Sequence, residues 1–272
     1  MTCRSLAGLF LGLIAAVAVV LTAQGPAVGA EMSAYDIVKK AEDLLDQAKD
    51  SKADMIMTLV NDKGQKRERK LSAFVKKYGE NSSKSILFFN SPADVKGTSF
   101  LVWTENKEDK QWLYLPALQR VRQISASGRG ESFMGTELTF FDMGSHDIDE
   151  YTFKTIKEED VDGEMCYMIE ALPRKVEFYS KIDLWIRKDS FIPAKADFYD
   201  PKGRYEKQGR FSQVKNIQNI NTPTRIEMHN VQNGSCLLYT SDAADDLLCV
   251  DLGGRRIHKK KKHASYTTPT SP

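Results

Sequence analysis

The sequence predicts a mainly β fold of the α+β class, in which one helix precedes a long, curved antiparallel sheet. Short runs of residues alternate between polar and apolar and are separated by turn residues, which is the pattern of strands joined by hairpins. Helical runs do not alternate with these strands, so the order of elements excludes a parallel βαβ array. About ten strands follow one another, and an open twisted sheet of that length curls to give a concave face.

Residues 1–30 form a predicted export signal. Arg4 provides the positive start, residues 6–23 are almost continuously apolar, and residues 28–30 are small, as a cleavage site requires. The apolar run is also about long enough to cross a bilayer, so an uncleaved anchor is the alternative. We expect cleavage after Ala30 and a soluble, unlipidated protein in the periplasm.

Charge and cysteine content argue against several functions. The chain has 39 Lys and Arg against 37 Asp and Glu, which gives a formal net charge of +2. Nucleic-acid binding requires a strongly basic face, so we expect none. Cys166 lies between apolar residues of a predicted strand, and we expect it to be a small buried side chain rather than a reactive thiol.

The first structural element is a predicted helix over residues 33–49. Ser33 is placed to cap it, and Asp36 three residues later gives a weak capping box. Apolar residues recur at helical spacing and form one stripe: Ile37, Val38, Ala41, Leu44, Leu45 and Ala48. We expect this stripe to lie on the concave face of the sheet, either as a fixed core helix or as a movable lid.

The sheet begins with a hairpin. Met55, Met57 and Leu59 share one face of the first strand, residues 61–64 turn, and residues 65–76 return. Further strands are expected over residues 84–89, 98–105, 150–158, 164–172, 181–187, 191–200, 204–214 and 222–232.

The central segment, residues 111–143, departs from simple alternation. Its first strand has four large residues in a row, Trp112 to Leu115, so both faces of this strand need apolar surroundings. Pro116 ends the strand, and an alternating strand over residues 119–124 and a glycine-rich loop follow. The remainder is rich in aromatic residues and methionine, and its partner is not defined by any periodicity.

Residues 235–272 differ from the rest of the chain. Asn233 and Gly234 form a strong hairpin turn that requires a return strand, and the residues just after it could supply one. The later residues shift to a lysine run and a Thr/Pro/Ser-rich end, and CLLYTSDAADDLL resembles translated sequencing-adapter DNA. We expect this segment to be foreign to the native chain, with the sheet edge after Gln232 unpaired; a genuine disordered basic tail is the alternative.

Catalytic and metal chemistry have little support in the sequence. His146 and His229 are far apart and lack a serine, cysteine or acid at a recognised spacing. Acidic residues cluster between positions 142 and 150, and we expect this loop cluster to be solvated. We therefore expect no enzyme activity, no cofactor and no metal site.

Binding of a hydrophobic ligand is the better supported class. The large apolar side chains exceed what a thin sheet needs for its own closure, and flexible methionines suit a cavity for varied acyl chains. The candidate lipid-binding residues are Met55, Met57, Leu59, Trp103, Trp112, Tyr114, Phe133, Met134, Leu138, Phe140 and Phe141. Arg120 and Arg122 are candidates for closing a lid or meeting a lipid headgroup, and ordinary cross-strand pairing is the alternative.

The blocks WLYLPALQRVRQI, SFMG and FFDM in the central segment carry a family resemblance. They are similar to the signature of LolA-like outer-membrane lipoprotein-sorting proteins, the periplasmic lipoprotein and lipid carriers of Gram-negative bacteria. The similarity covers roughly residues 34–234. The resemblance implies a curved, incomplete antiparallel β-barrel of the LolA/LolB kind, with a helical lid and a hydrophobic cavity for acyl chains.

We therefore predict that residues 31–234 form a LolA-like lipid-binding domain that acts as a monomeric carrier or chaperone between the inner and outer membranes. Its expected partners are lipoprotein acyl chains or free lipid, an inner-membrane transporter and an outer-membrane acceptor. Two alternatives remain open. One is an accessory lipid-binding partner of a membrane exporter, and the other is a sensory module of the same fold that binds a membrane-anchored signalling protein.

Overall fold

The structure is a computed structural model that describes residues 31–45, 47–48, 50–79 and 81–242. The helices and strands of the described residues all belong to one compact unit, which begins at Ser33. The predicted export signal lies outside the described residues, as does the part of the predicted foreign tail after Asp242.

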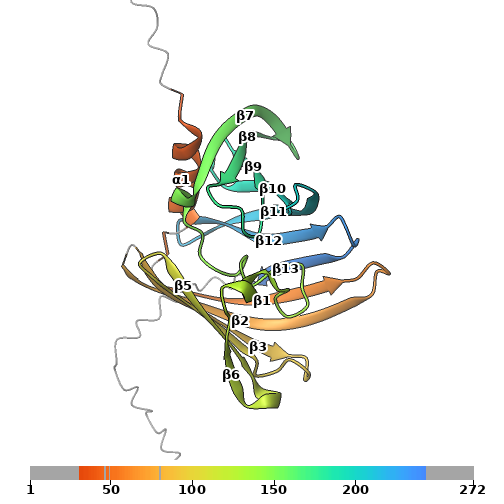
Figure 1. The fold of residues 1–272 in the computed structure, drawn as a ribbon. Helices are drawn as coiled ribbons and strands as arrows, with labels where there is room; N and C mark the ends of the chain where they lie inside the picture. Colours follow the sequence, from red (N-terminus) through yellow and green to blue (C-terminus); the bar gives the residue numbers. More distant parts are fainter. Residues whose placement is uncertain (1–30, 46, 49, 80, 243–272) are drawn as a thin grey trace, which may run out of the picture. The chain divides into compact units, whose positions relative to one another are not determined.

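Thirteen strands form a single antiparallel sheet in the described part of the chain (Figure 1). They are β1 (Asp50–Val60), β2 (Lys66–Gly79), β3 (Ser82–Ser91), β4 (Ser99–Glu105), β5 (Glu108–Leu115), β6 (Arg120–Gln123), β7 (Tyr151–Val161), β8 (Glu164–Pro173), β9 (Lys181–Arg187), β10 (Pro193–Tyr199), β11 (Tyr205–Ile217), β12 (Ile220–Asn230) and β13 (Cys236–Asp242). Their order is β6-β5-β4-β3-β2-β1-β13-β12-β11-β10-β9-β8-β7, so β6 and β7 are edges and the sheet is open. The predicted open antiparallel sheet is confirmed, but about ten strands was too low a count.

Strand β13 joins the two halves of the sheet. It pairs with β1 on one side and with β12 on the other. The turn before it reverses the chain because Gly234 adopts φ +75°. Leu237 of β13 is then fully buried in the main core, the cluster of buried apolar side chains that includes Met57, Phe100 and Leu113. The sheet edge after Gln232 is therefore paired, and the expectation of an unpaired edge was wrong. The foreign origin of residues 235–272 stays a prediction.

One α-helix, α1 (Ala34–Leu45), precedes the sheet among the described residues. Ser33 caps it as predicted, since its Oγ accepts from Asp36 N at 3.1 Å and donates to Asp36 Oδ2 at 2.7 Å. The helix contacts β7, β9 and β12, and Ile37 and Val38 are buried while Leu45 is exposed. None of the helices in the described ranges is long and apolar enough to cross a membrane.

Alternation gives β1 to β5 two distinct faces. On the inner face Met57, Phe100 and Leu113 are buried in the main core. On the outer face Trp112 and Tyr114 are half-buried, so the run of four large residues in β5 does place apolar side chains on both faces. The predicted corner after β5 is also present, as the short 3-10 turn η1 (Pro116–Leu118).

Candidate functional site

Residues 124–150, here called the plug, connect the edge strands β6 and β7 and cover the inner face of the sheet (Figure 1). The plug contains two 3-10 turns, η2 (Ser127–Gly130) and η3 (Ile148–Glu150), and one isolated bridge between Ser132 and Thr139. The expected lid over these strands was a helix. In the described residues it is this irregular segment instead, because the chain must cross from one edge of the sheet to the other.

Aromatic side chains dock the plug on the sheet. Phe133 is fully buried and Phe140 is 4% exposed. The ring centroid of Phe133 lies 5.0 Å from that of Phe100 in β4, 5.5 Å from that of Phe140 and 6.2 Å from that of Phe89 in β3. Such pairs each contribute about 0.5–1.5 kcal/mol beyond burial. The plug therefore fills the inner face with its own side chains.

A buried ion pair ties the plug to the second half of the sheet. Lys207 of β11 is fully buried, and its Nζ lies 2.6 Å from Asp142 Oδ2. Tyr179 donates its hydroxyl to Asp142 Oδ1 at 2.8 Å, and Lys207 also donates to the Glu137 carbonyl at 3.0 Å. We call Lys207, Asp142 and Tyr179 the latch.

The latch sets the charge state of Asp142. Burial alone raises the pKa of a carboxyl group. Here the attraction and hydrogen bond of Lys207, with hydrogen bonds from Thr139 and Tyr179, outweigh burial, so the pKa of Asp142 is lowered from its ordinary value of 3.8. Burial raises the pKa of Tyr179, and the Asp142 carboxylate acts in the same direction. Asp142 is therefore an ionised carboxylate with a specific buried cation.

Further side chains hold the plug along its length. Arg69 Nη1 donates to the Met134 carbonyl at 2.8 Å, and Gln111 Nε2 donates to the Phe140 carbonyl at 3.0 Å. Between the two ends of the plug, every backbone–backbone hydrogen bond in the described residues stays within the plug itself. Side chains alone therefore fasten the middle of the plug to the sheet, and it can detach without breaking a strand pairing.

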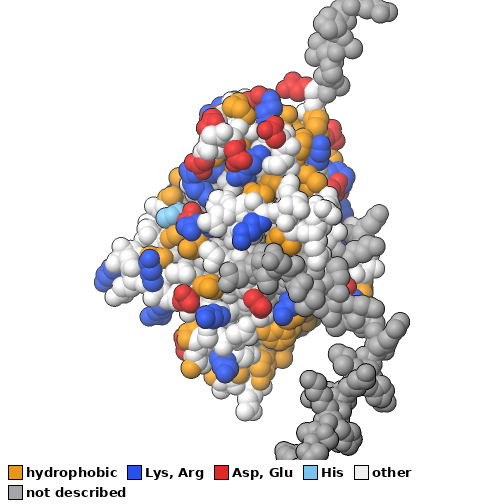
Figure 2. Space-filling model, turned by 180° about the vertical axis from the view of Figure 1, so that it is seen from behind, with side chains coloured by type: hydrophobic (Ala, Val, Ile, Leu, Met, Phe, Trp, Pro, Cys, Tyr) orange, Lys and Arg blue, Asp and Glu red, His pale blue; other side chains and the backbone are white. Residues whose placement is uncertain are grey.

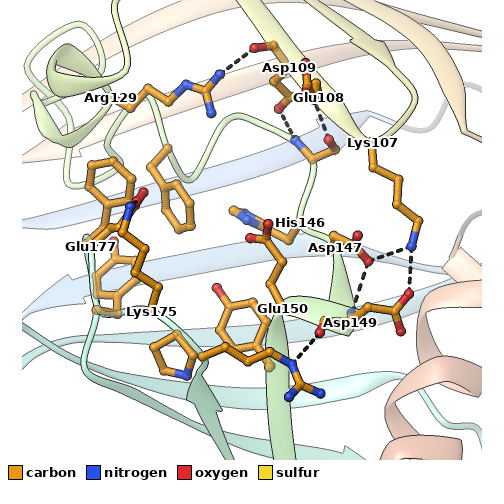
Figure 3. Close-up of a pocket in the computed structure, with 17 residues that line it drawn as sticks. Lys107, Glu108, Asp109, Arg129, His146, Asp147, Asp149, Glu150, Lys175 and Glu177 are labelled. Atoms are coloured by element: carbon orange, nitrogen blue, oxygen red, sulfur yellow. Dashed lines mark hydrogen bonds and ion pairs between the residues drawn. The ribbon is translucent and has the colours of Figure 1, made fainter.

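Two polar clefts share Lys107, Ser145, His146, Asp147 and Asp149 in their walls, and their volumes are about 620 and 720 Å³. In the first, Lys107 extends from the β4–β5 turn to Asp147 at 2.9 Å and Asp149 at 2.7 Å, and Arg129 points toward the backbone of Asp109 (Figure 3). Six carboxylates and four Lys or Arg side chains line this cleft. Such a wall suits polar groups and does not suit an acyl chain.

The structure separates the predicted lipid-binding residues into three groups. The first packs in or against the main core on the inner face, and comprises Met55, Met57 and Leu59 of the sheet with Phe133, Met134, Leu138 and Phe140 of the plug. The second lies on the outer face of β4 and β5, and comprises Trp103, Trp112 and Tyr114. Phe141 stands apart in the wall of the first polar cleft, where its ring centroid is 4.4 Å from that of Phe178.

Of the two predicted arginines, Arg122 forms an exposed ion pair with Glu131 of the plug at 3.1 Å, and Arg120 is exposed on β6. Their proposed contact with a headgroup stays a prediction. Sequence reasoning missed the latch lysine. The available signal was its position, because Lys207 shares the buried face of β11 with Gly209, where alternation calls for an apolar or small residue.

Cys166 is fully buried beside Trp185 and Ala194, and burial raises the pKa of its thiol to about 11. The predicted burial of Cys166 is confirmed, and the raised pKa disfavours the thiolate near neutral pH. Within the described ranges, no group of three or more His, Cys, Asp or Glu side chains is arranged to hold a metal ion.

The chain resembles solved structures over most of its length. A family model described as an uncharacterized protein matches residues 81–240. A DUF1329 family protein from Desulfovibrio piger is 33% identical, with 77% of this chain and 90% of that chain covered and a TM-score of 0.73. A “putative outer membrane lipoprotein-sorting protein domain” from Vibrio parahaemolyticus is 30% identical, with the same coverage of 77% and 90% and a TM-score of 0.72.

The fold extends to a more distant relative. A LolA superfamily protein from Nitrosomonas europaea has 20% identity and a TM-score of 0.62, with 78% of this chain and 92% of that chain covered. No curated protein matches the chain. From the two relatives at 30% identity or more, the matched family model and the shared open sheet, we conclude that the chain belongs to the LolA-like family of outer-membrane lipoprotein-sorting proteins.

Proposed function

We propose that the protein is a periplasmic carrier that binds acyl chains of lipoproteins or other lipids on the inner face of its sheet, in place of the plug. One observation carries the proposal. Within a LolA-like sheet, the inner face is filled by apolar side chains of an irregular segment that only side chains hold in its middle. An acyl chain that displaced Phe133 and Phe140 would keep the sheet side chains out of water.

The free energies of the two occupants are of the same order. An acyl chain of about fourteen methylenes gains on the order of 10 kcal/mol on burial, at about 0.8 kcal/mol per methylene, before ordering costs. Undocking the plug exposes several large apolar side chains, at roughly 1.5–3 kcal/mol each, and separates the buried ion pair. Burial of the acyl chain therefore offsets much of the cost of undocking the plug.

Burial by itself gives transport no direction. The carrier therefore needs a donor that delivers cargo and an acceptor that takes it, which we place at an inner-membrane transporter and an outer-membrane acceptor. Hydrophobic exchange at the inner face requires neither a cofactor nor covalent chemistry. Binding selectivity then rests on the shape of the opened inner face.

Native mass spectrometry of the protein extracted from a cell envelope is the first test. We expect co-purified acyl lipid or lipoprotein. An empty protein with a stoichiometric protein partner would contradict the carrier function and favour the sensory alternative.

A photoreactive fatty acid then locates the ligand. We expect its labels on Met55, Met57 and Leu59, which line the inner face of β1. Labels confined to Trp112 and Tyr114, on the outer face, would contradict binding beneath the plug.

A further inference from the structure

The outer face of β2 to β6 carries a continuous apolar surface. Phe74, Ile86, Leu101 and Trp112 stand directly opposite one another on four successive strands. The outer patch is defined as these four residues with Trp103, Tyr114 and Val121. A hydrophobic area is visible in the lower part of Figure 2, over the strands that Figure 1 shows as β3 to β6.

Two shallow apolar hollows lie in the outer patch. Their volumes are about 240 and 390 Å³, and both are lined by Ile86 and Leu101, so they adjoin. Val121 is 65% exposed and Phe74 is 36% exposed. Single exposed apolar residues are ordinary on a protein surface, whereas a contiguous apolar patch marks an interaction site.

Lysine side chains lie beside the aromatic residues of the outer patch. Lys84 Nζ lies 3.9 Å from the centroid of the Trp103 ring, and Lys52 Nζ lies 5.8 Å from that of Phe74. Lys76, Lys84, Trp103 and Lys110 form one row across four strands. The carboxylates of this face lie at its margins: Asp50 and Asp54 on β1, Glu68 near the start of β2, and Glu105 with Glu108 at the β4–β5 turn. Asp54 Oδ2 lies 3.9 Å from Lys52 Nζ.

This combination identifies the kind of partner. Protein–protein interfaces are depleted of lysine relative to the rest of the surface, and a row of lysines beside the patch does not suit one. Tryptophan and tyrosine are enriched at membrane–water interfaces, and lysine stems lie along apolar surface while the ammonium groups reach phosphates. Each lysine near an anionic bilayer contributes about 1 kcal/mol.

We propose that the outer patch docks the protein on the surface of an anionic phospholipid bilayer. Trp103 and Trp112 enter the headgroup boundary, and Lys52, Lys76, Lys84 and Lys110 meet lipid phosphates. The plug covers the opposite face of these strands, so docking leaves it free to open toward a partner. The inference goes beyond the proposed carrier function and does not require acyl chains to bind the inner face.

Vesicle co-sedimentation of the full chain tests this. We use phosphatidylcholine vesicles with or without about one-third phosphatidylglycerol, at low and high salt. Lys84→Gln with Lys110→Gln should weaken binding to the anionic vesicles roughly thirtyfold, at about tenfold per 1.4 kcal/mol, and reduce its salt dependence. Trp103→Thr with Trp112→Thr should weaken binding to both kinds of vesicle. Segments outside the described residues are the same in every variant, so the differences report on the outer patch.

Two controls keep the test decisive. Ile156→Thr with Met165→Thr removes exposed apolar residues of β7 and β8, which are 44% and 50% exposed, and should leave binding unchanged. In the unmodified protein, brominated lipids should quench the fluorescence of Trp103 and Trp112, a result that needs no folded variant. The proposal is overturned if both outer-patch variants bind the vesicles as well as the unmodified protein does, or if the brominated lipids do not quench the fluorescence. It is also overturned if the unmodified protein is a dimer and the tryptophan variant alone is monomeric, because the outer patch is then a protein interface.

Discussion

Lys207 holds the plug to the sheet through a buried ion pair with Asp142. A buried ion pair adds little net stability, because desolvation offsets its attraction, but removing one partner leaves the other charge buried without compensation. In this protein the orphaned group would be Asp142, which is joined to Lys207 at 2.6 Å. The pair therefore acts less as a stabilising contact than as a condition for the plug to stay docked.

We expect Lys207→Met to destabilise the docked plug by about 3–5 kcal/mol. Because the plug is fastened by side chains, it should detach before the sheet unfolds. Hydrogen exchange should then accelerate in residues 124–150, and a fluorescent fatty acid should load more tightly.

The matched control is Lys195→Met. Lys195 forms a partly buried pair with Asp197 at 2.9 Å on β10, outside the plug and its contacts. The Lys195→Met variant should be less stable, but hydrogen exchange in the plug should not accelerate and the fluorescent fatty acid should not bind more tightly. If the two variants load the fatty acid equally, the latch does not govern opening.

Acid should weaken the docked plug through Asp142. Its folded-state pKa is lower than its ordinary value of 3.8, so it contributes stability above that pH. This contribution is lost as pH falls below 3.8 and through the folded-state pKa. In Lys207→Met, burial and the hydrogen bonds from Thr139 and Tyr179 remain while the attraction of Lys207 is lost, so the pKa of Asp142 rises and less stability is lost as pH falls.

Urea unfolding at several pH values between about 3 and 7 measures this effect. The difference in unfolding free energy between the unmodified protein and Lys207→Met should shrink on acidification. A difference that does not depend on pH would show that Asp142 is not the group that responds.

The inner-face residues Met55, Met57 and Leu59 could be predicted because alternation in a strand fixes which side chains share a face. Alternation does not say whether that face is hollow or filled. The answer depends on Phe133 and Phe140, which contact it from a segment far along the sequence. Sequence reasoning grouped them with Trp112 and Tyr114, although the structure puts these pairs on opposite faces.

Strands were predicted far better than the cover over them. Period-two runs and turn residues are local signals, so the succession of hairpins and the corner at Pro116 could be read from the sequence. The plug has no periodicity of its own. Its position follows from the topology, because it links edge strands that are far apart in the sheet, and pairing order is not encoded in any single segment.

Strand β13 should be essential to the sheet. Deleting residues 235–272 removes the only strand that pairs with both β1 and β12 in the described part of the chain, and exposes two unpaired edges. We expect a much lower Tm and aggregation. Deleting residues 243–272 alone keeps all thirteen strands and should leave Tm unchanged. Equal Tm values for the two truncations would contradict the pairing role of β13.

Cargo binding should stabilise the whole molecule by mass action. A ligand present at about 100 times its Kd adds about 2.7 kcal/mol to the unfolding free energy. We expect a fatty acid to raise Tm in the unmodified protein. The apparent affinity equals the intrinsic affinity multiplied by the fraction of molecules whose plug is open, so Lys207→Met should show the larger shift per unit of ligand. A fatty acid that leaves Tm unchanged in both proteins would argue against an acyl ligand.

The placement of β13 between the two halves has a consequence for how the protein is made. Strands β1 to β6 and β7 to β12 can each form by neighbouring hairpins, but their union waits for residues 236–242, which are synthesised after all the others in the sheet. A nascent chain therefore cannot lock into its final shape early. Sealing of the sheet is therefore the last step of its assembly, after each of the other twelve strands in the described part of the chain has been synthesised.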